Sequence, residues 1–77
     1  MRVLIQRVKR ASVLIGGKDK REINQGMCIF IGITHGDDES KADWLAEKIS
    51  GLRIFEDSDG KTNLSIHDVN GEILLVS

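Results

Sequence analysis

The apolar residues of one stretch repeat with a helical period. Between residues 38 and 53 they follow the i, i+3, i+4, i+7 spacing that places one apolar stripe on a helix, and they are Ala42, Leu45, Ala46, Ile49 and Leu52. Either Asp37 or Asp38 is placed to cap the start, because a short side-chain oxygen accepts a hydrogen bond from a free backbone N–H there. Trp44 lies about 160° from the centre of the stripe by the 100°-per-residue rule. We therefore expect an amphipathic helix whose tryptophan faces solvent, a partner chain or protein beyond these residues.

The segments before this helix have the composition of strands. Residues 2–8 and 11–15 are rich in Val, Leu and Ile, and Gly16-Gly17 is a turn signal that leads to a polar return strand over residues 18–23. The basic side chains of that return strand suit a sheet edge. Residues 27–34 are almost entirely apolar, which is typical of a strand buried on both faces.

The segments after the helix combine short strands with hairpin signals, because Asp-Gly and Asn-Gly favour the positive φ that tight turns need. In order, we predict a strand at residues 53–55, a hairpin turn at Asp59-Gly60, a strand at 63–69, a second hairpin turn at Asn70-Gly71 and a buried strand at 72–76. The predicted fold class is α/β of the α+β type: one domain over residues 1–77, with antiparallel-rich sheets and hairpins packed against one helix.

The last predicted strand runs into the C-terminus without a turn. A buried strand with nothing after it leaves backbone groups and an apolar face without partners. The pattern therefore predicts a truncated domain. A chain of this size also lies where a single core rarely supplies more than ~3–5 kcal/mol.

Composition narrows the class of protein. A hydrophobic content of 40% is typical of a globular chain, and no apolar run approaches the ~18 residues of a membrane span. The N-terminus lacks a signal-peptide pattern and Cys28 is the single cysteine, so we expect a cytoplasmic protein.

Charge is unevenly distributed along the chain. Residues 1–21 contain seven basic residues and one acidic residue, although the whole chain carries a net charge of −1. Such asymmetry is compatible with an anionic partner such as nucleic acid, but the charge balance of the whole chain favours charges that only keep strand faces soluble.

Three patterns that resemble chemical sites have simpler interpretations. Residues 57–60 place glycine at the fourth position instead of the sixth that a calcium loop requires, so a hairpin turn is favoured. His35 and His67 lack ligand-type spacing to each other or to Cys28, which predicts no metal site. Cys28 lies in the most apolar strand and is expected to be a buried structural thiol.

Two residues are candidates for a site. Arg7 lies in an apolar strand, where its guanidinium group either reaches solvent at an edge or fixes a backbone carbonyl of a site. Ser77 follows an inner strand, a common position for a site residue.

Several segments in a fixed order resemble the D-aminoacyl-tRNA deacylase family, also called D-tyrosyl-tRNA deacylases. They are MRVLIQRV (residues 1–8), RASV (10–13), GITHGD (32–37), ADWLAEKI (42–49), LRIFED (52–57), GKTNLS (60–65) and GEILLVS (71–77). The resemblance implies a homodimeric cytoplasmic esterase that hydrolyses the bond between a D-amino acid and the 3′ end of tRNA. It also implies that glycine mischarged on tRNA for alanine is cleared, that D-aminoacyl-tRNA is the partner, and that no metal, cofactor or membrane is involved.

The resemblance also assigns site residues. Ser77 matches the first residue of a catalytic Ser-Gln-x-Thr motif, and Arg7 matches the arginine that holds a second loop, which carries a Gly-Pro motif, in place. The remaining residues of both motifs are absent, because the sequence ends at Ser77 and contains no proline. The resemblance therefore covers the N-terminal half of the family fold. The alternative is a non-catalytic truncated fragment that at most binds tRNA or a full-length partner.

Overall fold

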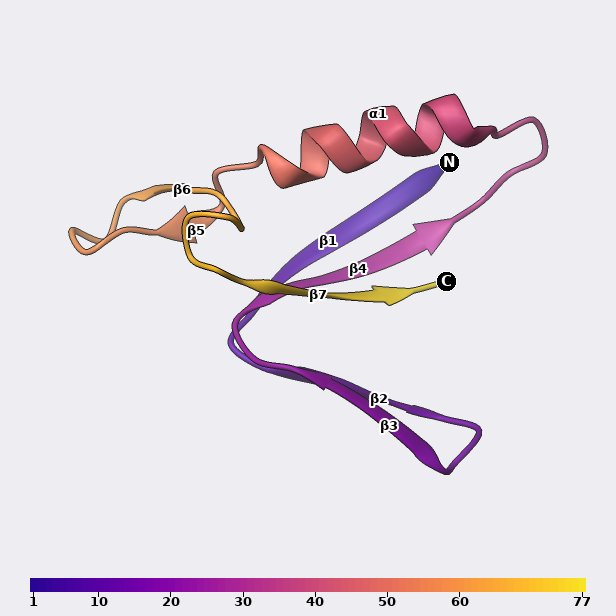
Figure 1. The fold of residues 1–77 in the computed structure, drawn as a ribbon, viewed down its shortest axis with the longest axis horizontal. Coiled ribbons are helices and arrows are strands. Elements are labelled where there is room, and N and C mark those ends of the chain that lie inside the picture. Colours follow the sequence, from indigo (N-terminus) through magenta and orange to yellow (C-terminus); the bar gives the residue numbers. More distant parts are fainter.

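A computed structural model describes residues 1–77 and contains one helix and seven strands (Figure 1). In chain order they are β1 (Arg2–Val8), β2 (Ala11–Ile15), β3 (Asp19–Ile23), β4 (Gly26–Gly32), α1 (Glu39–Ser50), β5 (Phe55–Glu56), β6 (Thr62–Leu64) and β7 (Glu72–Val76). The strands form a three-stranded sheet and two two-stranded ribbons. The predicted α+β class, with one helix against antiparallel hairpins, is confirmed.

The main sheet has the order β1-β4-β7. β1 is antiparallel to β4, with Arg2 opposite Gly32 and Val8 opposite Gly26. β7 is parallel to β4, with Gly26 opposite Glu72 and Phe30 opposite Val76. Thus β4 alone has partners on both sides, and β7 reaches its place only after the chain has passed through α1, β5 and β6 (Figure 1).

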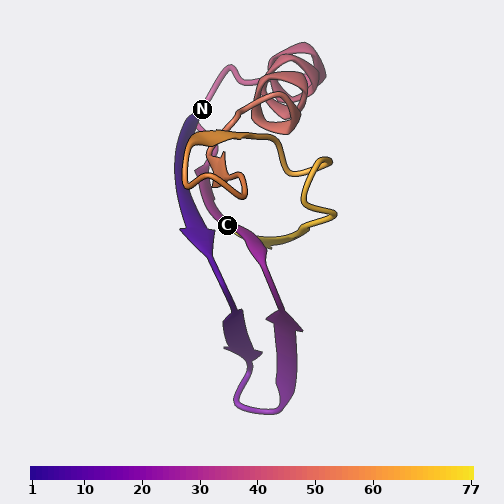
Figure 2. The same ribbon diagram turned by 90° about the vertical axis from the view of Figure 1, so that its left-hand side faces the viewer.

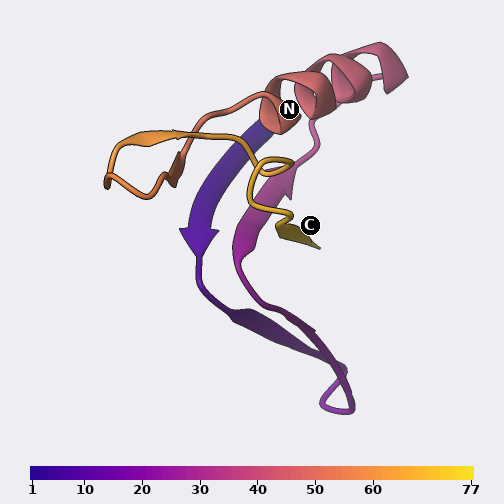
Figure 3. The same cartoon turned by 60° about the vertical axis from the view of Figure 1, so that its left-hand side comes forward.

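Alternation along β4 creates two small cores, one on each face of the sheet. Met27 and Ile29 point to the face that α1 covers, where they pack with Ile49, Phe55 and Ile66. Figure 3 shows α1 and the chain after it on this side of the sheet. Cys28 points to the opposite face, where it packs with Ile23 and Leu74. The prediction of a buried, structural Cys28 is confirmed.

The β2–β3 hairpin extends away from the main sheet on the side opposite α1 (Figure 2). Its strands pair from Ala11–Ile23 to Ile15–Asp19, as the sequence predicted. Gly16 and Gly17 have φ values of 59° and 71°, the left-handed conformation that only glycine adopts without strain. The amide of Lys18 donates to the carbonyl of Ile15 at 3.1 Å and closes the turn.

Capping defines the ends of α1. The Asp38 carboxylate accepts a hydrogen bond from the backbone N–H of Lys41 at 3.1 Å, so Asp38 is the N-cap. The N–H of Gly51 donates to the carbonyls of Glu47 and Lys48, and the helix ends at Ser50, three residues before the predicted boundary at residue 53. Trp44 is exposed, as predicted. This helix is too short and too polar to span a membrane.

The predicted strand at residues 63–69 is wrong beyond Leu64. Ser65 and Asp68 cap each other: the Ser65 N–H donates to the Asp68 carboxylate at 2.9 Å, and the Asp68 N–H donates to the Ser65 hydroxyl at 3.3 Å. This reciprocal pair holds residues 66–70 in turns. The predicted hairpin at Asn70-Gly71 is also wrong, because the following strand pairs with β4 and not with β6. Asn70 does have the expected positive φ, 51°.

The strands at 27–34 and 72–76 are less buried than predicted. Met27 to Ile29 are buried, but Phe30 is 41% exposed and Leu75 is 61% exposed. α1 does not cover β7, and an apolar recess of about 300 Å³ remains between Leu45 and Ile49 of α1 and Ile73 and Leu75 of β7. The radius of gyration is 13.8 Å, whereas a compact domain of this length has roughly 11.5 Å.

Gly26 tests the parallel pairing of β4 with β7. A Cβ atom at this position would overlap the carbonyl oxygen of Glu72, whereas a Cβ atom at Gly32 would lie 3.9 Å from its nearest neighbour, the carbonyl oxygen of Arg2. We expect Gly26→Ala to lower the free energy of unfolding by about 1–3 kcal/mol or more, measured by urea titration. Gly32→Ala is the matched control and should change it by less than about 1 kcal/mol. Equal effects of the two substitutions would contradict the β4–β7 register.

Candidate functional site

Arg7 lies near the end of β1 and lines an open recess of about 470 Å³ with Lys9, Gln25, Phe55 and Glu56. Its Nη1 donates a hydrogen bond to the backbone carbonyl of Ile54 at 2.8 Å. Its Nη2 lies 3.8 Å from the Glu56 carboxylate. Both side chains are about half exposed, so this ion pair contributes little and the hydrogen bond to the carbonyl is the principal contact.

The Arg7 contact joins two segments that are distant in sequence. The carbonyl of Ile54 directly precedes Phe55, which is 1% exposed and lies in the core beneath α1. Arg7 therefore fixes the chain where it leaves α1 and enters β5. A guanidinium–carbonyl contact is what the sharper sequence interpretation of Arg7 expected. The participation of that carbonyl in a site stays a prediction.

Ser77 follows β7 and lines a second, shallow recess of about 410 Å³. The recess is mainly apolar, and its walls come from the ends of β1 and β4 as well as β7, with Leu4, Phe30 and Val76 among them. The Ser77 side chain is exposed and accepts or donates no side-chain hydrogen bond. A serine hydroxyl becomes a nucleophile when a neighbouring base activates it, and these residues bring no such base to Ser77.

The structure does not bring Arg7 and Ser77 together within this chain. Arg7 is opposite Met27 of β4, whereas Val76, the neighbour of Ser77, is opposite Phe30. Met27 and Phe30 are three positions apart, which corresponds to roughly 10 Å along the strand, and Ser77 lies one residue further. The two candidate residues therefore flank the main sheet from opposite ends, and their roles in one site stay a prediction.

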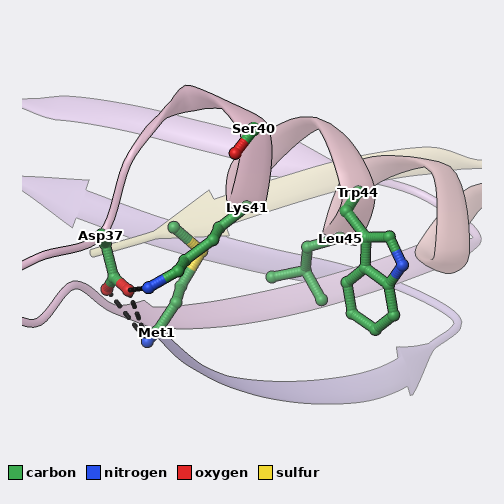
Figure 4. A pocket seen from close by; sticks show the side chains of 6 residues that line it. All are labelled: Met1, Asp37, Ser40, Lys41, Trp44 and Leu45. Atoms are coloured by element: carbon green, nitrogen blue, oxygen red, sulfur yellow. Dashed lines mark hydrogen bonds and ion pairs between the residues drawn. The ribbon is translucent and has the colours of Figure 1, made fainter.

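A third cluster surrounds Asp37, which sequence reasoning treated only as a possible helix cap. Its carboxylate is 4% exposed and lies 2.9 Å from the α-ammonium group of Met1. It also accepts hydrogen bonds from the backbone N–H of Thr34 at 2.7 Å and from the Thr34 hydroxyl at 3.0 Å. Figure 4 shows Met1 and Lys41 pointing to this carboxylate. The sequence signal was the Thr-x-x-Asp spacing, which allows local side-chain to backbone bonding.

Hydrogen bonds to the carboxylate of Asp37 hold its pKa well below the usual range. The backbone N–H of Thr34 is the largest cause and the ammonium group of Met1 is the second, while burial opposes them. The pKa of Asp38 is lowered in the same way by the Ser40 hydroxyl and the N–H of Lys41. These shifts reflect capping and loop closure, because each carboxylate is satisfied by its own neighbours.

The remaining acidic candidates are also structural. The backbone N–H groups of Lys61 and Asp59 lower the pKa of Asp57, and the same bonds close the β5–β6 turn in place of a calcium loop. Bonds from the N–H and hydroxyl of Ser65 lower the pKa of Asp68. No group of three or more His, Cys, Asp or Glu side chains is placed to hold a metal ion.

The sequence comparisons agree with one another. A profile of the family described as D-Tyr-tRNA(Tyr) deacylase matches residues 4–77. A protein named D-aminoacyl-tRNA deacylase from Thermotoga petrophila is 51% identical over all 77 residues. Proteins of the same name from Exiguobacterium sp. and Caldicellulosiruptor saccharolyticus are 53% and 52% identical over the same length.

A solved structure supports the fold. The protein titled c-Myc DNA Unwinding Element Binding Protein superposes with a TM-score of 0.88 at 39% sequence identity, covering 97% of this chain and 51% of that chain. The three sequence relatives are likewise matched over 52% of their own length. The chain therefore spans about half the length of the relatives it matches.

The Arg7 contact predicts a difference between two neighbouring substitutions. Arg7→Gln removes the hydrogen bond to Ile54, and we expect it to lower the free energy of unfolding by about 1 kcal/mol in a urea titration. Glu56→Gln removes only the long, exposed ion pair and should cost less than about 0.5 kcal/mol. A larger loss for Glu56→Gln would show that the ion pair, and not the carbonyl contact, holds this segment.

The lowered pKa of Asp37 predicts how stability depends on pH. The native state binds a proton at this group less readily than the unfolded chain, whose Asp pKa is about 3.9, so the stabilisation is present above that pH and is lost as the pH falls below it. We expect Asp37→Asn to reduce the fall in the urea midpoint between pH 5 and pH 2.5 without abolishing it, because Asp38, Asp57 and Asp68 also have lowered pKa values. Asp19→Asn, on the exposed hairpin, is the control and should leave it unchanged.

Proposed function

The chain belongs to the D-Tyr-tRNA(Tyr) deacylase family, and we propose that it forms the N-terminal half of an enzyme that hydrolyses the ester between a D-amino acid and tRNA. The single observation that carries this proposal is the match of all 77 residues, at 51–53% identity, to proteins named D-aminoacyl-tRNA deacylase. The family assignment agrees with the motifs that the sequence analysis identified.

The proposed reaction is ester hydrolysis. Water adds to the carbonyl carbon of the aminoacyl group, the bond to the ribose oxygen of the terminal nucleotide breaks, and a free D-amino acid and a tRNA with a free hydroxyl leave. The same step would release glycine mischarged on tRNA for alanine. We assign Ser77 to the start of the catalytic motif because it stands where the family motif begins and because it borders an open recess.

In this proposal the half described here supplies the scaffold for the site. Ser77 follows β7, an edge strand of the β1-β4-β7 sheet, and Arg7 holds the chain after α1 by its bond to Ile54. The Gln and Thr of the first motif and the whole Gly-Pro loop would come from residues beyond Ser77. We also propose a homodimer and a cytoplasmic setting, where aminoacyl-tRNA is present.

The alternative is a chain that binds tRNA without cleaving it. Its basis is the basic character of residues 1–21. The structure distributes these charges between β1 and the distant β2–β3 hairpin, and it engages Arg7 with Ile54 and Lys20 with Glu22. A dispersed, partly paired set of charges is a weaker phosphate-binding surface than one continuous basic patch, so we favour the family activity.

Complementation in trans tests the proposal. The 77-residue chain is mixed with the part of the Thermotoga petrophila relative that it does not match, and loss of ester from D-tyrosyl-tRNA is measured, with L-tyrosyl-tRNA as the control substrate. We expect D-selective hydrolysis in the mixture at least about tenfold above buffer, and none with either piece alone, since each piece lacks part of the site.

Two further samples make the outcome decisive. Ser77→Ala should reduce hydrolysis by the mixture, whereas Ser12→Ala, on the exposed face of the hairpin, should not. The full-length relative serves as the positive control. Absence of hydrolysis by the mixture when the full-length relative is active would contradict the proposal. A salt-dependent shift in tRNA mobility without hydrolysis would instead support the binding alternative.

A further inference from the structure

The recess at the end of β1 gathers two cationic side chains on one face of the sheet. Val3 and Ile5 of β1 pack against the core beneath α1, whereas Val8 packs against the core on the opposite face. The alternation of a strand therefore directs Arg7 to the α1 side, and Lys9, two positions further, to the same side. Both residues line the recess of about 470 Å³.

Glu56 is the only acidic residue in the lining of this recess, and it leaves hydrogen-bond donors free. Nη2 of Arg7 lies 3.8 Å from the Glu56 carboxylate, which is beyond hydrogen-bond distance. Only Nη1 is engaged, by the carbonyl of Ile54, and a guanidinium group has five N–H donors. Lys9 is exposed and takes part in none of the ion pairs of the chain. Two basic side chains and one acidic side chain give the lining a net charge of +1.

The remaining walls of the recess come from two other parts of the chain. Gln25 precedes β4, and its backbone carbonyl accepts a hydrogen bond from the N–H of Glu72 at 3.0 Å, which fixes it beside the start of β7. Its side chain is exposed and carries an amide that can donate. Phe55, which is 1% exposed, anchors the recess to the core. The fold thus holds cationic and amide donors around an opening that solvent can reach, an arrangement suited to an anion.

Phosphate is the anion that the proposed substrate offers. The carboxyl group of an esterified amino acid carries no charge, so the negative charges of an aminoacyl-tRNA lie on its phosphodiesters. A lysine binds phosphate as a point charge, and an arginine binds it through a planar set of donors. Arg7 and Ser77 also lie at opposite ends of the sheet, separated by at least roughly 10 Å. If the ester lies at Ser77, the recess therefore meets the RNA backbone away from the reacting bond.

We propose that this recess binds one backbone phosphate of the tRNA substrate. Lys9 supplies the principal charge, and Arg7 adds the N–H groups that Ile54 does not use. Glu56 opposes the phosphate and limits the affinity for RNA. The inference rests on the proposed function for the identity of the RNA, and it concerns the affinity of the chain for that RNA rather than the chemical step.

Binding of uncharged tRNA to the 77-residue chain tests this contact, because no ester is present to be cleaved. The Kd is measured by fluorescence anisotropy between about 50 and 200 mM KCl. We expect Lys9→Gln to raise the Kd about fivefold and to reduce the slope of log K against log salt by about 1, the share of one phosphate contact. Lys18→Gln, in the exposed turn of the β2–β3 hairpin, removes the same charge outside the recess. It should change the Kd by less than about twofold.

Glu56→Gln gives an effect that loss of folding cannot imitate. Removal of the opposing carboxylate should lower the Kd at least about threefold. Glu47→Gln, on the exposed surface of α1, is its matched control and should change the Kd by less than about twofold. Exchange of chloride for inorganic phosphate at equal ionic strength should preserve the effect of Lys9→Gln. Loss of that effect would show that free phosphate fills the recess and would overturn the assignment to RNA.

Three further results would overturn the proposal. They are equal effects of Lys9→Gln and Lys18→Gln, an unchanged Kd for Glu56→Gln, and absence of salt-dependent binding by the unsubstituted chain. The complementation assay separates these results from a failure of the proposed function. Hydrolysis by the mixture with an unchanged affinity for Lys9→Gln rejects only the phosphate contact, whereas binding that depends on Lys9 without hydrolysis supports the contact and rejects only the activity.

Discussion

β4 is the constraint on which the structure depends, because it alone has hydrogen-bonded partners on both edges and a small core on each face. Met27 and Ile29 require the cover that α1 and Phe55 provide, and Cys28 requires Ile23 and Leu74. Only nine of the 77 residues are buried, so few contacts elsewhere compensate for a loss at this strand. The covering elements come from every part of the chain, so a loss at β4 would uncover residues in all of them.

Polar contacts fix the positions of elements that such a small core cannot hold in place alone. β1 is fixed at both ends by charged groups: the Met1 ammonium binds Asp37 before α1, and Arg7 binds the carbonyl of Ile54 after it. The two contacts bracket the helix, and together they set its position over the sheet. Arg7, which we propose as a residue that supports the site, is one of these two fixed points.

Local patterns predicted local structure well. The sequence predicted the helix, the Gly16-Gly17 turn and the exposed Trp44, because each of these features depends on residues that are close in sequence. The sequence did not predict the parallel pairing of β7 with β4. Asn70-Gly71 is a hairpin signal, whereas the direction of β7 is decided by a strand that is distant in sequence. The strand predicted at residues 63–69 was wrong for a different reason, because the local capping pair of Ser65 and Asp68 overrode the strand pattern. For the site, sequence indicated Arg7 and Ser77, but it could not reveal that Asp37 binds the N-terminus.

The strand order β1-β4-β7 has a consequence for how the chain folds during its synthesis. β1, the β2–β3 hairpin and β4 are contiguous, so they can pair as soon as they leave the ribosome. β7 emerges after all of these elements, and its parallel register closes a long loop that includes α1. Until then, one edge of β4 is an open template for any extended segment nearby. The time for which this edge of β4 stays unpaired in the nascent chain therefore depends on the rate of translation. Slow codons before residue 72 would lengthen that time.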